Sequence, residues 1–373
     1  MTNFNNANQF IPWAKPTFWG NEQNYVVEAL NSTWISGGPF VDRFEKDFSK
    51  YTGSPFALTS SNGTTAIHMA YLALGLKPGD EVIVPGFGFL AAANLALQFG
   101  ARPVFADVDP ETWLVTAQEI EKCLSPKTKI IVPIHTYGNV CEMDKIVELG
   151  HNHDIAIVED SAEAFASQYK GHQAGTMGAI GTFSFQATKT ITTGEGGMTV
   201  TENEELNTRM ALYRSHGMLR KTYYWHELPG HNFRLTNLQA ALGCAQLEKL
   251  DHIIRERNRV YSHYKQYLST SYGITPQFFS PDVDPVLWAM AIKLDKRAYP
   301  QGRDKVIKQM THLQIETRPG FYSPSIMEFY SCPGLPISDK ISEQVISLPT
   351  FPSLQNDEIE YICNSLICLQ RDS

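Results

Sequence analysis

Strand-like and helix-like segments alternate along the first half of the chain, and this alternation limits the folds that it can adopt. Apolar runs predict strands over 57–59, 102–108, 130–134 and 155–158, and a turn into a buried strand over 79–85. Stretches with helical spacing predict helices over 22–31, 41–51, 65–74, 90–99, 116–123 and 142–153. Such alternation is typical of an α/β fold in which helices cover both faces of a mostly parallel sheet. Ligands bind at the loops after the carboxyl ends of such strands.

The second half of the chain predicts a further unit. After residue 201 the pattern turns helical, and a long helix predicted over 251–269 has the character of a connector. Strand-like segments return at 286–292 and 315–317, and a final helix is predicted over 357–369. Because 373 residues can form two domains with large cores, we predict a large domain over 1–250 and a smaller α+β domain over 251–373.

Composition and charge exclude several classes of protein. The net charge is −8 and no basic stripe is present, so nucleic acid is not an expected partner. The polar N-terminus lacks the apolar core of a signal peptide, and no apolar run approaches a membrane span, so we expect a cytoplasmic protein without membrane contact. The six cysteines are scattered without a C-x-x-C pair, which disfavours a disulfide framework and a metal site.

One lysine stands in a segment of small residues and glycines between two strand-like runs. Lys189 lies within 184–197, after the run 181–185 and before the run 198–201. A lysine fixed at the end of a buried strand is poorly solvated, which favours the free amine that acts as a nucleophile. A surface lysine on a hairpin loop is the alternative at this point.

Further candidate residues lie at the ends of predicted elements. Gly63 and Thr64 stand at a predicted helix start, where free N–H groups, a hydroxyl and the helix dipole suit a phosphate. A plain Ser/Thr/Asn helix cap is the simpler explanation at this point. Asp160 directly follows the apolar strand 155–158, where its carboxylate could pair with a cation or cap a helix. An aromatic pair, Phe87 and Phe89, follows an earlier strand, and the segment 135–139 follows another.

The order of these groups matches what pyridoxal 5'-phosphate (PLP) needs. A helix start takes the phosphate, an aromatic ring covers the cofactor ring, an aspartate pairs with the pyridinium nitrogen, and a lysine bonds to the aldehyde. With these groups, the chain resembles the DegT/DnrJ/EryC1/StrS family of sugar aminotransferases. The resemblance is spread over the segments 34–36, 61–66, 79–85, 159–160, 184–185, 230–234 and 347–349. It implies an aspartate-aminotransferase-like fold of PLP fold type I, with a mostly parallel seven-stranded sheet.

The resemblance implies roles for the residues around the cofactor. Lys189 is expected to form the Schiff base and to carry a proton, and Asp160 is expected to hold the pyridinium nitrogen charged. Glu163 stands where the family places a residue near the phenolic oxygen, and Phe89 resembles the ring-stacking aromatic.

The resemblance also implies how the phosphate is held. Gly63, Thr64 and Ser184 are expected to bind it within one chain. Asn232 resembles the residue that reaches the phosphate of the neighbouring subunit, which implies a homodimer with shared active sites.

The implied reaction moves an amino group from L-glutamate to a nucleotide-linked keto-sugar, with pyridoxamine 5'-phosphate as the intermediate form of the cofactor. The segment 189–198 resembles the perosamine-synthase group, and its Gly-Glu-Gly-Gly at 194–197 resembles the enzymes that form 4-amino sugars. The resemblance therefore implies 4-amino-4,6-dideoxy sugars for surface polysaccharide such as O-antigen. Residues expected to contact substrate are Trp34, Ser36, His216, Trp225 and Arg318. A 3-keto sugar or an aminocyclitol as acceptor, a UDP- or dTDP-linked sugar, and a non-catalytic PLP-binding regulator are the alternatives.

Overall fold

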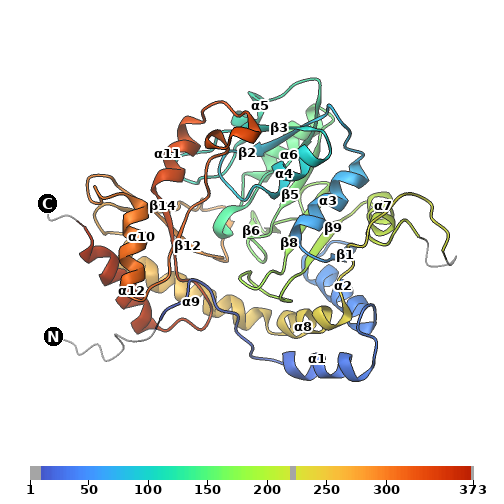
Figure 1. Cartoon of the computed structure of the whole chain (residues 1–373), viewed down its shortest axis with the longest axis horizontal. Helices are drawn as coiled ribbons and strands as arrows, with labels where there is room; N and C mark the ends of the chain where they lie inside the picture. Colours follow the sequence, from blue (N-terminus) through green and yellow to red (C-terminus); the bar gives the residue numbers. More distant parts are fainter. Residues whose placement is uncertain (1–9, 219–223, 371–373) are drawn as a thin grey trace.

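A seven-stranded sheet forms the centre of the larger part of the molecule (Figure 1). The computed structural model describes residues 10–218 and 224–370. In spatial order the strands are β1 (Phe56–Ser60), β9 (Gly197–Thr201), β8 (Ile180–Ser184), β5 (Ala156–Asp160), β4 (Thr128–Ile131), β2 (Glu81–Pro85) and β3 (Arg102–Ala106). Only β9 runs against its neighbours β1 and β8, while the other pairs are parallel. The predicted mostly parallel seven-stranded sheet is confirmed.

Helices bury both faces of this sheet because its strands are apolar on both sides. In β2, Val82 and Val84 belong to one core, whereas Ile83 belongs to the core on the opposite face. The first core contains residues of α3 (Gly63–Leu74), α4 (Ala91–Gln98) and α7 (Glu204–Arg214). The second contains residues of α5 (Ala117–Glu121) and α6 (Met143–Asn152). A third core joins β8 and β9 to α2 (Pro39–Thr52) and α8 (Asn237–Glu248), and α1 (Glu22–Asn31) packs against α8.

A smaller antiparallel sheet belongs to the C-terminal part of the chain. Its order is β10 (Ile274–Pro276), β12 (Met290–Leu294), β14 (Val345–Leu348) and β13 (Arg318–Pro319). It shares a core with residues of α9 (Leu250–Leu268), α10 (Arg303–His312) and α12 (Asn356–Cys368). The remaining elements are α11 (Pro336–Gln344), the 3-10 helices η1 (Thr136–Gly138), η2 (Pro324–Ile326) and η3 (Glu328–Tyr330), and a small sheet of β11 (Val283–Asp284), β6 (Gln168–Tyr169) and β7 (His172–Gln173). The predicted α/β fold class with an α+β C-terminal part is confirmed.

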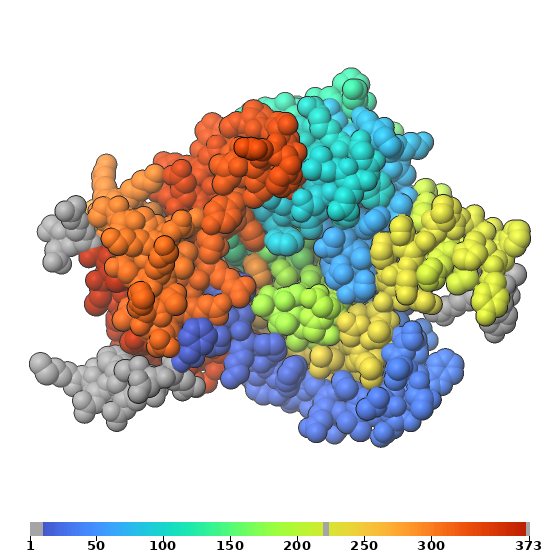
Figure 2. Space-filling model, in the orientation of Figure 1, coloured from blue at the N-terminus to red at the C-terminus, as the bar shows by residue number. Residues whose placement is uncertain are grey.

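The two parts share α9 and the N-terminal segment. Leu250 and Ile253 of α9 belong to the core around α8, whereas Tyr264 belongs to the C-terminal core. Ile11 also lies in the C-terminal core and forms a parallel bridge with Ile315. Figure 2 shows this blue N-terminal segment next to orange C-terminal residues. The division at residue 250 therefore stays a prediction.

Among the helices of the described ranges, none combines the length and the apolar character that crossing a bilayer requires. The cytoplasmic location stays a prediction.

Candidate active site

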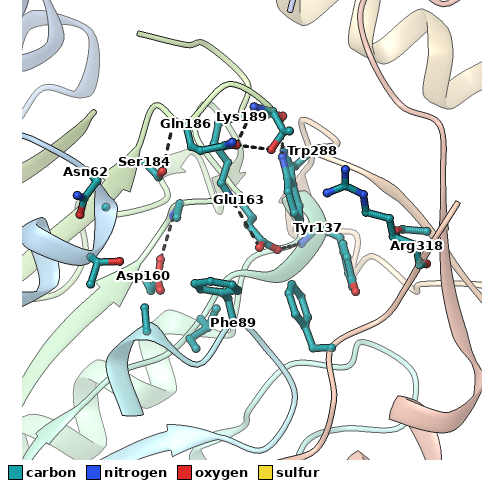
Figure 3. Close-up of a pocket in the computed structure, with 18 of the residues that line it drawn as sticks. Asn62, Phe89, Tyr137, Asp160, Glu163, Ser184, Gln186, Lys189, Trp288 and Arg318 are labelled. Atoms are coloured by element: carbon teal, nitrogen blue, oxygen red, sulfur yellow. Dashed lines mark hydrogen bonds and ion pairs between the residues drawn. The ribbon is translucent and has the colours of Figure 1, made fainter. Parts of the chain in front are cut away.

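A cavity of about 440 Å³ lies where the carboxyl ends of β5 and β8 meet the start of α3 and residues of the C-terminal part (Figure 3). Eight of the residues expected at the site line it, namely Gly63, Thr64, Phe89, Asp160, Glu163, Ser184, Lys189 and Arg318. They come together because the carboxyl ends of parallel strands lie at the same edge of a sheet.

The start of α3 forms a cradle at one end of the cavity. The Asn62 side chain accepts a hydrogen bond from the Thr65 N–H at 2.8 Å, so Asn62 is the helix cap. The N–H groups of Gly63 and Thr64 have no partner among the described residues, and both residues line the cavity. A Cβ at Gly63 would lie 2.9 Å from the Ser184 Cβ, so glycine permits this close approach. The cradle offers free N–H groups, a hydroxyl and the positive end of a helix dipole to a phosphate.

Asp160 presents a buried carboxylate to the cavity. Its Oδ1 accepts a hydrogen bond from the Ala162 N–H at 3.1 Å, while Oδ2 accepts none from the described residues. No helix begins directly after β5, so the helix-cap alternative for Asp160 is wrong. Burial raises the pKa of this carboxyl, although the Lys189 charge opposes the change. A cationic N–H partner would stabilise the ionised carboxylate.

A buried pair supports the end of the strand that carries Asp160. The backbone N–H of His135 donates to the backbone carbonyl of Asp160 at 3.0 Å. The His135 Nδ1 accepts from the Cys141 N–H at 3.2 Å, so Nε2 donates to Glu159, 3.1 Å away. Glu159 also accepts from the N–H of Gly175 at 2.8 Å. The pair fixes the backbone from which the Asp160 side chain projects.

Lys189 is enclosed rather than free on the surface. Its side chain is 14% exposed, and Nζ lies 3.5 Å from Glu163 Oε1. The ammonium also lies 3.9 Å from the centroid of the Trp288 ring, and the Trp288 Nε1–H donates to the Thr188 carbonyl at 2.9 Å. The alternative of a surface lysine is therefore wrong.

Glu163 lies between the lysine and the backbone of η1. Only 4% of its side chain is exposed, and its Oε2 accepts from the Tyr137 N–H at 3.1 Å. Burial raises the pKa of Glu163 to about 7, and the nearby Lys189 charge limits the rise. The group can therefore exchange a proton near neutral pH.

These residues fit PLP. Phe89 lines the cavity with 59% of its surface exposed, and Figure 3 shows its ring next to Asp160. One cavity is bordered by an exposed aromatic face, a phosphate cradle, an enclosed lysine and an aspartate oxygen that accepts no hydrogen bond from the described part of the chain. When bound, PLP supplies the electron sink that stabilises negative charge beside the reacting amine.

The remaining predicted residues do not border this cavity. Trp34 and Ser36 line a second cavity of about 480 Å³ together with Arg234. His216, Trp225 and Asn232 line neither cavity. Their assignment to substrate or to a neighbouring phosphate stays a prediction.

Tyr137, in the segment 135–139 that follows a predicted strand, also lines the cavity. Sequence reasoning missed three other aromatic residues of the site, namely Trp13, Trp288 and Phe321. Trp13 and Trp288 reach the site from distant segments, and no local spacing indicates their role.

The chain matches the DegT/DnrJ/EryC1/StrS aminotransferase family over residues 17–367. It is 41% identical over 361 residues to a GDP-perosamine synthase of Escherichia coli O157:H7, in an alignment that covers 96% of this chain and 98% of that protein. The structure of the aminotransferase TlmJ from Streptoalloteichus hindustanus has a TM-score of 0.91 at 30% identity and covers 96% of this chain and 98% of its own. The Streptococcus pneumoniae protein Spr1654 in its PLP form has a TM-score of 0.91 at 25% identity, with 97% and 98% covered.

The family match spans nearly the whole chain, and the cavity holds the groups that PLP requires. The protein is a PLP-dependent aminotransferase of fold type I, and it belongs to the DegT/DnrJ/EryC1/StrS aminotransferase family.

Proposed function

We propose that the protein transfers an amino group from L-glutamate to a nucleotide-linked 4-keto-6-deoxy sugar, and that it gives a 4-amino-4,6-dideoxy sugar and 2-oxoglutarate. The relative with 41% identity is named a GDP-perosamine synthase, and its alignment covers almost all of both chains. The product would serve the synthesis of surface polysaccharide. The structural observation that supports transamination most strongly is the enclosed Lys189 between Glu163 and Trp288.

The contacts of Lys189 suit proton transfer. Its Nζ can accept a proton from the donor substrate and return it to the reacting centre as general base and then general acid. Glu163 Oε1, 3.5 Å away, can share that proton near neutral pH because its pKa is about 7. The Trp288 face attracts the ammonium form and fixes its direction.

Asp160 has a separate role in this proposal. Its unpartnered Oδ2 would hold the protonated ring nitrogen of the cofactor, and the His135–Glu159 pair would keep the strand end in place. A carboxylate at this position favours the charged ring nitrogen, which strengthens the electron sink.

The acceptor sugar is tested with a panel. The purified holoenzyme is offered GDP-, UDP- and dTDP-linked keto-sugars with L-glutamate, and NMR of each product locates the new amine. We expect amination at C-4 and the highest kcat/KM with the GDP-linked 4-keto-6-deoxy sugar. Amination at C-3, or turnover only with an aminocyclitol precursor, would contradict the proposed substrate.

We propose further that two chains share each active site. Trp34 is 66% exposed beside the second cavity, and Asn232 is also exposed and lines neither cavity. A second chain can therefore cover both positions. In a mixed dimer of Lys189→Ala and Asn232→Ala chains, one site would keep both native residues.

Each variant alone should be inactive, and mixing Lys189→Ala with Asn232→Ala should therefore restore activity to a fraction of the chains. Sedimentation should show a dimer. Activity in a monomer, or no recovery after subunits have exchanged, would rule out the shared site.

A further inference from the structure

Arg318 is the second of two cations at the cavity. Among the described residues that line it, only Lys189 and Arg318 carry a positive charge. Lys189 already faces Glu163 and is the reacting amine. An anionic substrate that enters this cavity therefore meets Arg318 as its available cation within the described chain.

The guanidinium of Arg318 is fixed by two neighbours. It lies 4.4 Å from the centroid of the Trp13 ring. Its Nη2–H and Nε–H donate to Glu316 Oε1 at 3.1 and 3.4 Å, while its Nη1 donates to no described residue. Glu316 Oε2 accepts from the backbone N–H of Trp13 at 2.9 Å, so one carboxylate ties the Trp13 backbone to the cation.

The surrounding backbone is also rigid. Arg318 pairs with Ser347 in the β13–β14 ladder, and the Ser347 hydroxyl accepts from the Trp13 Nε1–H at 2.9 Å. Figure 3 shows the guanidinium directed toward Trp288 and the interior of the cavity. Yet the Arg318 side chain is 51% exposed, and an exposed ion pair adds little stability. A ligand explains this fixed orientation better than stability does.

We propose that Arg318 binds a carboxylate of the amino donor. The inference rests on the proposed function, in which an amino dicarboxylate is the first substrate. A planar guanidinium with a free Nη1 can donate charge-assisted hydrogen bonds to a carboxylate. The rival role is a contact with the diphosphate of the sugar nucleotide alone. The amino donor reacts before the sugar nucleotide does, so binding measurements without any sugar separate the two roles.

The test uses the PLP-loaded protein without any sugar. The Kd of glutarate, a dicarboxylate without an amine, is measured from the change in tryptophan fluorescence, and the Kd of L-glutamate is measured from single-turnover bleaching of the visible band. In Arg318→Gln both should weaken about 10- to 100-fold, as for the loss of a hydrogen bond between charged groups. Arg318→Lys keeps the charge without the planar fork, so its two Kd values should lie between those of Arg318→Gln and those of the wild type.

The matched control is Arg297→Gln. Arg297 is an exposed arginine of the same C-terminal part and lines neither large cavity, so both Kd values should stay at the wild-type level. Unchanged Kd values in Arg318→Gln, with a higher KM only for the sugar nucleotide, would overturn the proposal. If Arg318→Gln does not fold, the same comparison is made with Arg318→Lys. Neither Kd involves a keto-sugar, so a failed sugar panel would refute the proposed acceptor and leave this result standing.

Discussion

Replacing Glu163 by glutamine should change how the stability of the protein depends on pH. The carboxyl is buried, and its pKa in the folded chain is about 7 instead of the ordinary 4.5. Between these values the unfolded chain ionises Glu163, while the folded chain keeps it protonated. The free energy of unfolding of the wild type therefore falls as the pH rises from 4.5 to 7. The glutamine variant has no carboxyl at this position, so its free energy of unfolding lacks this decrease.

The magnitude follows from the two pKa values. The difference between 4.5 and about 7, at about 1.4 kcal/mol per pH unit, amounts to about 3 kcal/mol. The free energy of unfolding of Glu163→Gln, relative to the wild type, should therefore increase by about 3 kcal/mol between pH 4.5 and pH 8. The contact of Lys189 with the ionised carboxylate at 3.5 Å is already part of this balance.

Urea unfolding of the cofactor-free proteins at four pH values measures this difference. The control is Glu343→Gln, because Glu343 is an exposed residue that pairs with Lys296 at 2.9 Å on the surface. Its effect on stability should stay within about 1 kcal/mol at every pH. If the difference between wild type and Glu163→Gln does not vary with pH, the assignment of a buried, proton-sharing carboxyl at this position is refuted.

Two further substitutions test the cofactor site. Asp160→Asn should fold with unchanged circular dichroism but lose about 100- to 1,000-fold in kcat, because a neutral amide no longer holds the ring nitrogen protonated; a kcat within a few-fold of the wild type would contradict that role. Gly63→Ala places a Cβ 2.9 Å from the Ser184 Cβ and should weaken PLP binding about 10- to 100-fold in a fluorescence titration, and unchanged binding would mean that the phosphate lies elsewhere.

Much of the sheet could be predicted because local spacing determines it. The segment 79–85, predicted as a turn into a buried strand, is a turn followed by β2 (Glu81–Pro85). The strand predicted over 286–292 begins only at Met290. There the preceding backbone bonds to distant groups, since the Val286 N–H donates to Ser167 Oγ and the Trp288 N–H donates to the Tyr137 carbonyl. A local pattern cannot show such long-range bonds.

The candidate site was predictable where its residues follow strands. Asp160 and Lys189 meet because the carboxyl ends of β5 and β8 share one edge of the sheet. Trp288 could not be foreseen, because its contact with Thr188 joins residues a hundred positions apart. The same holds for Trp13, whose backbone N–H donates to Glu316, a residue far away in the sequence. Contacts of this kind depend on how the two parts of the molecule pack.

Lys189 is the residue that we propose bonds to PLP, and one measurement tests this directly. The holoenzyme is reduced with borohydride, which makes the bond between lysine and cofactor permanent, and the digested peptides are examined by mass spectrometry. We expect one modified peptide, with the cofactor on Lys189, and no modified peptide from Lys189→Ala. A modification at another lysine, or none in a folded wild-type protein saturated with PLP, would contradict it.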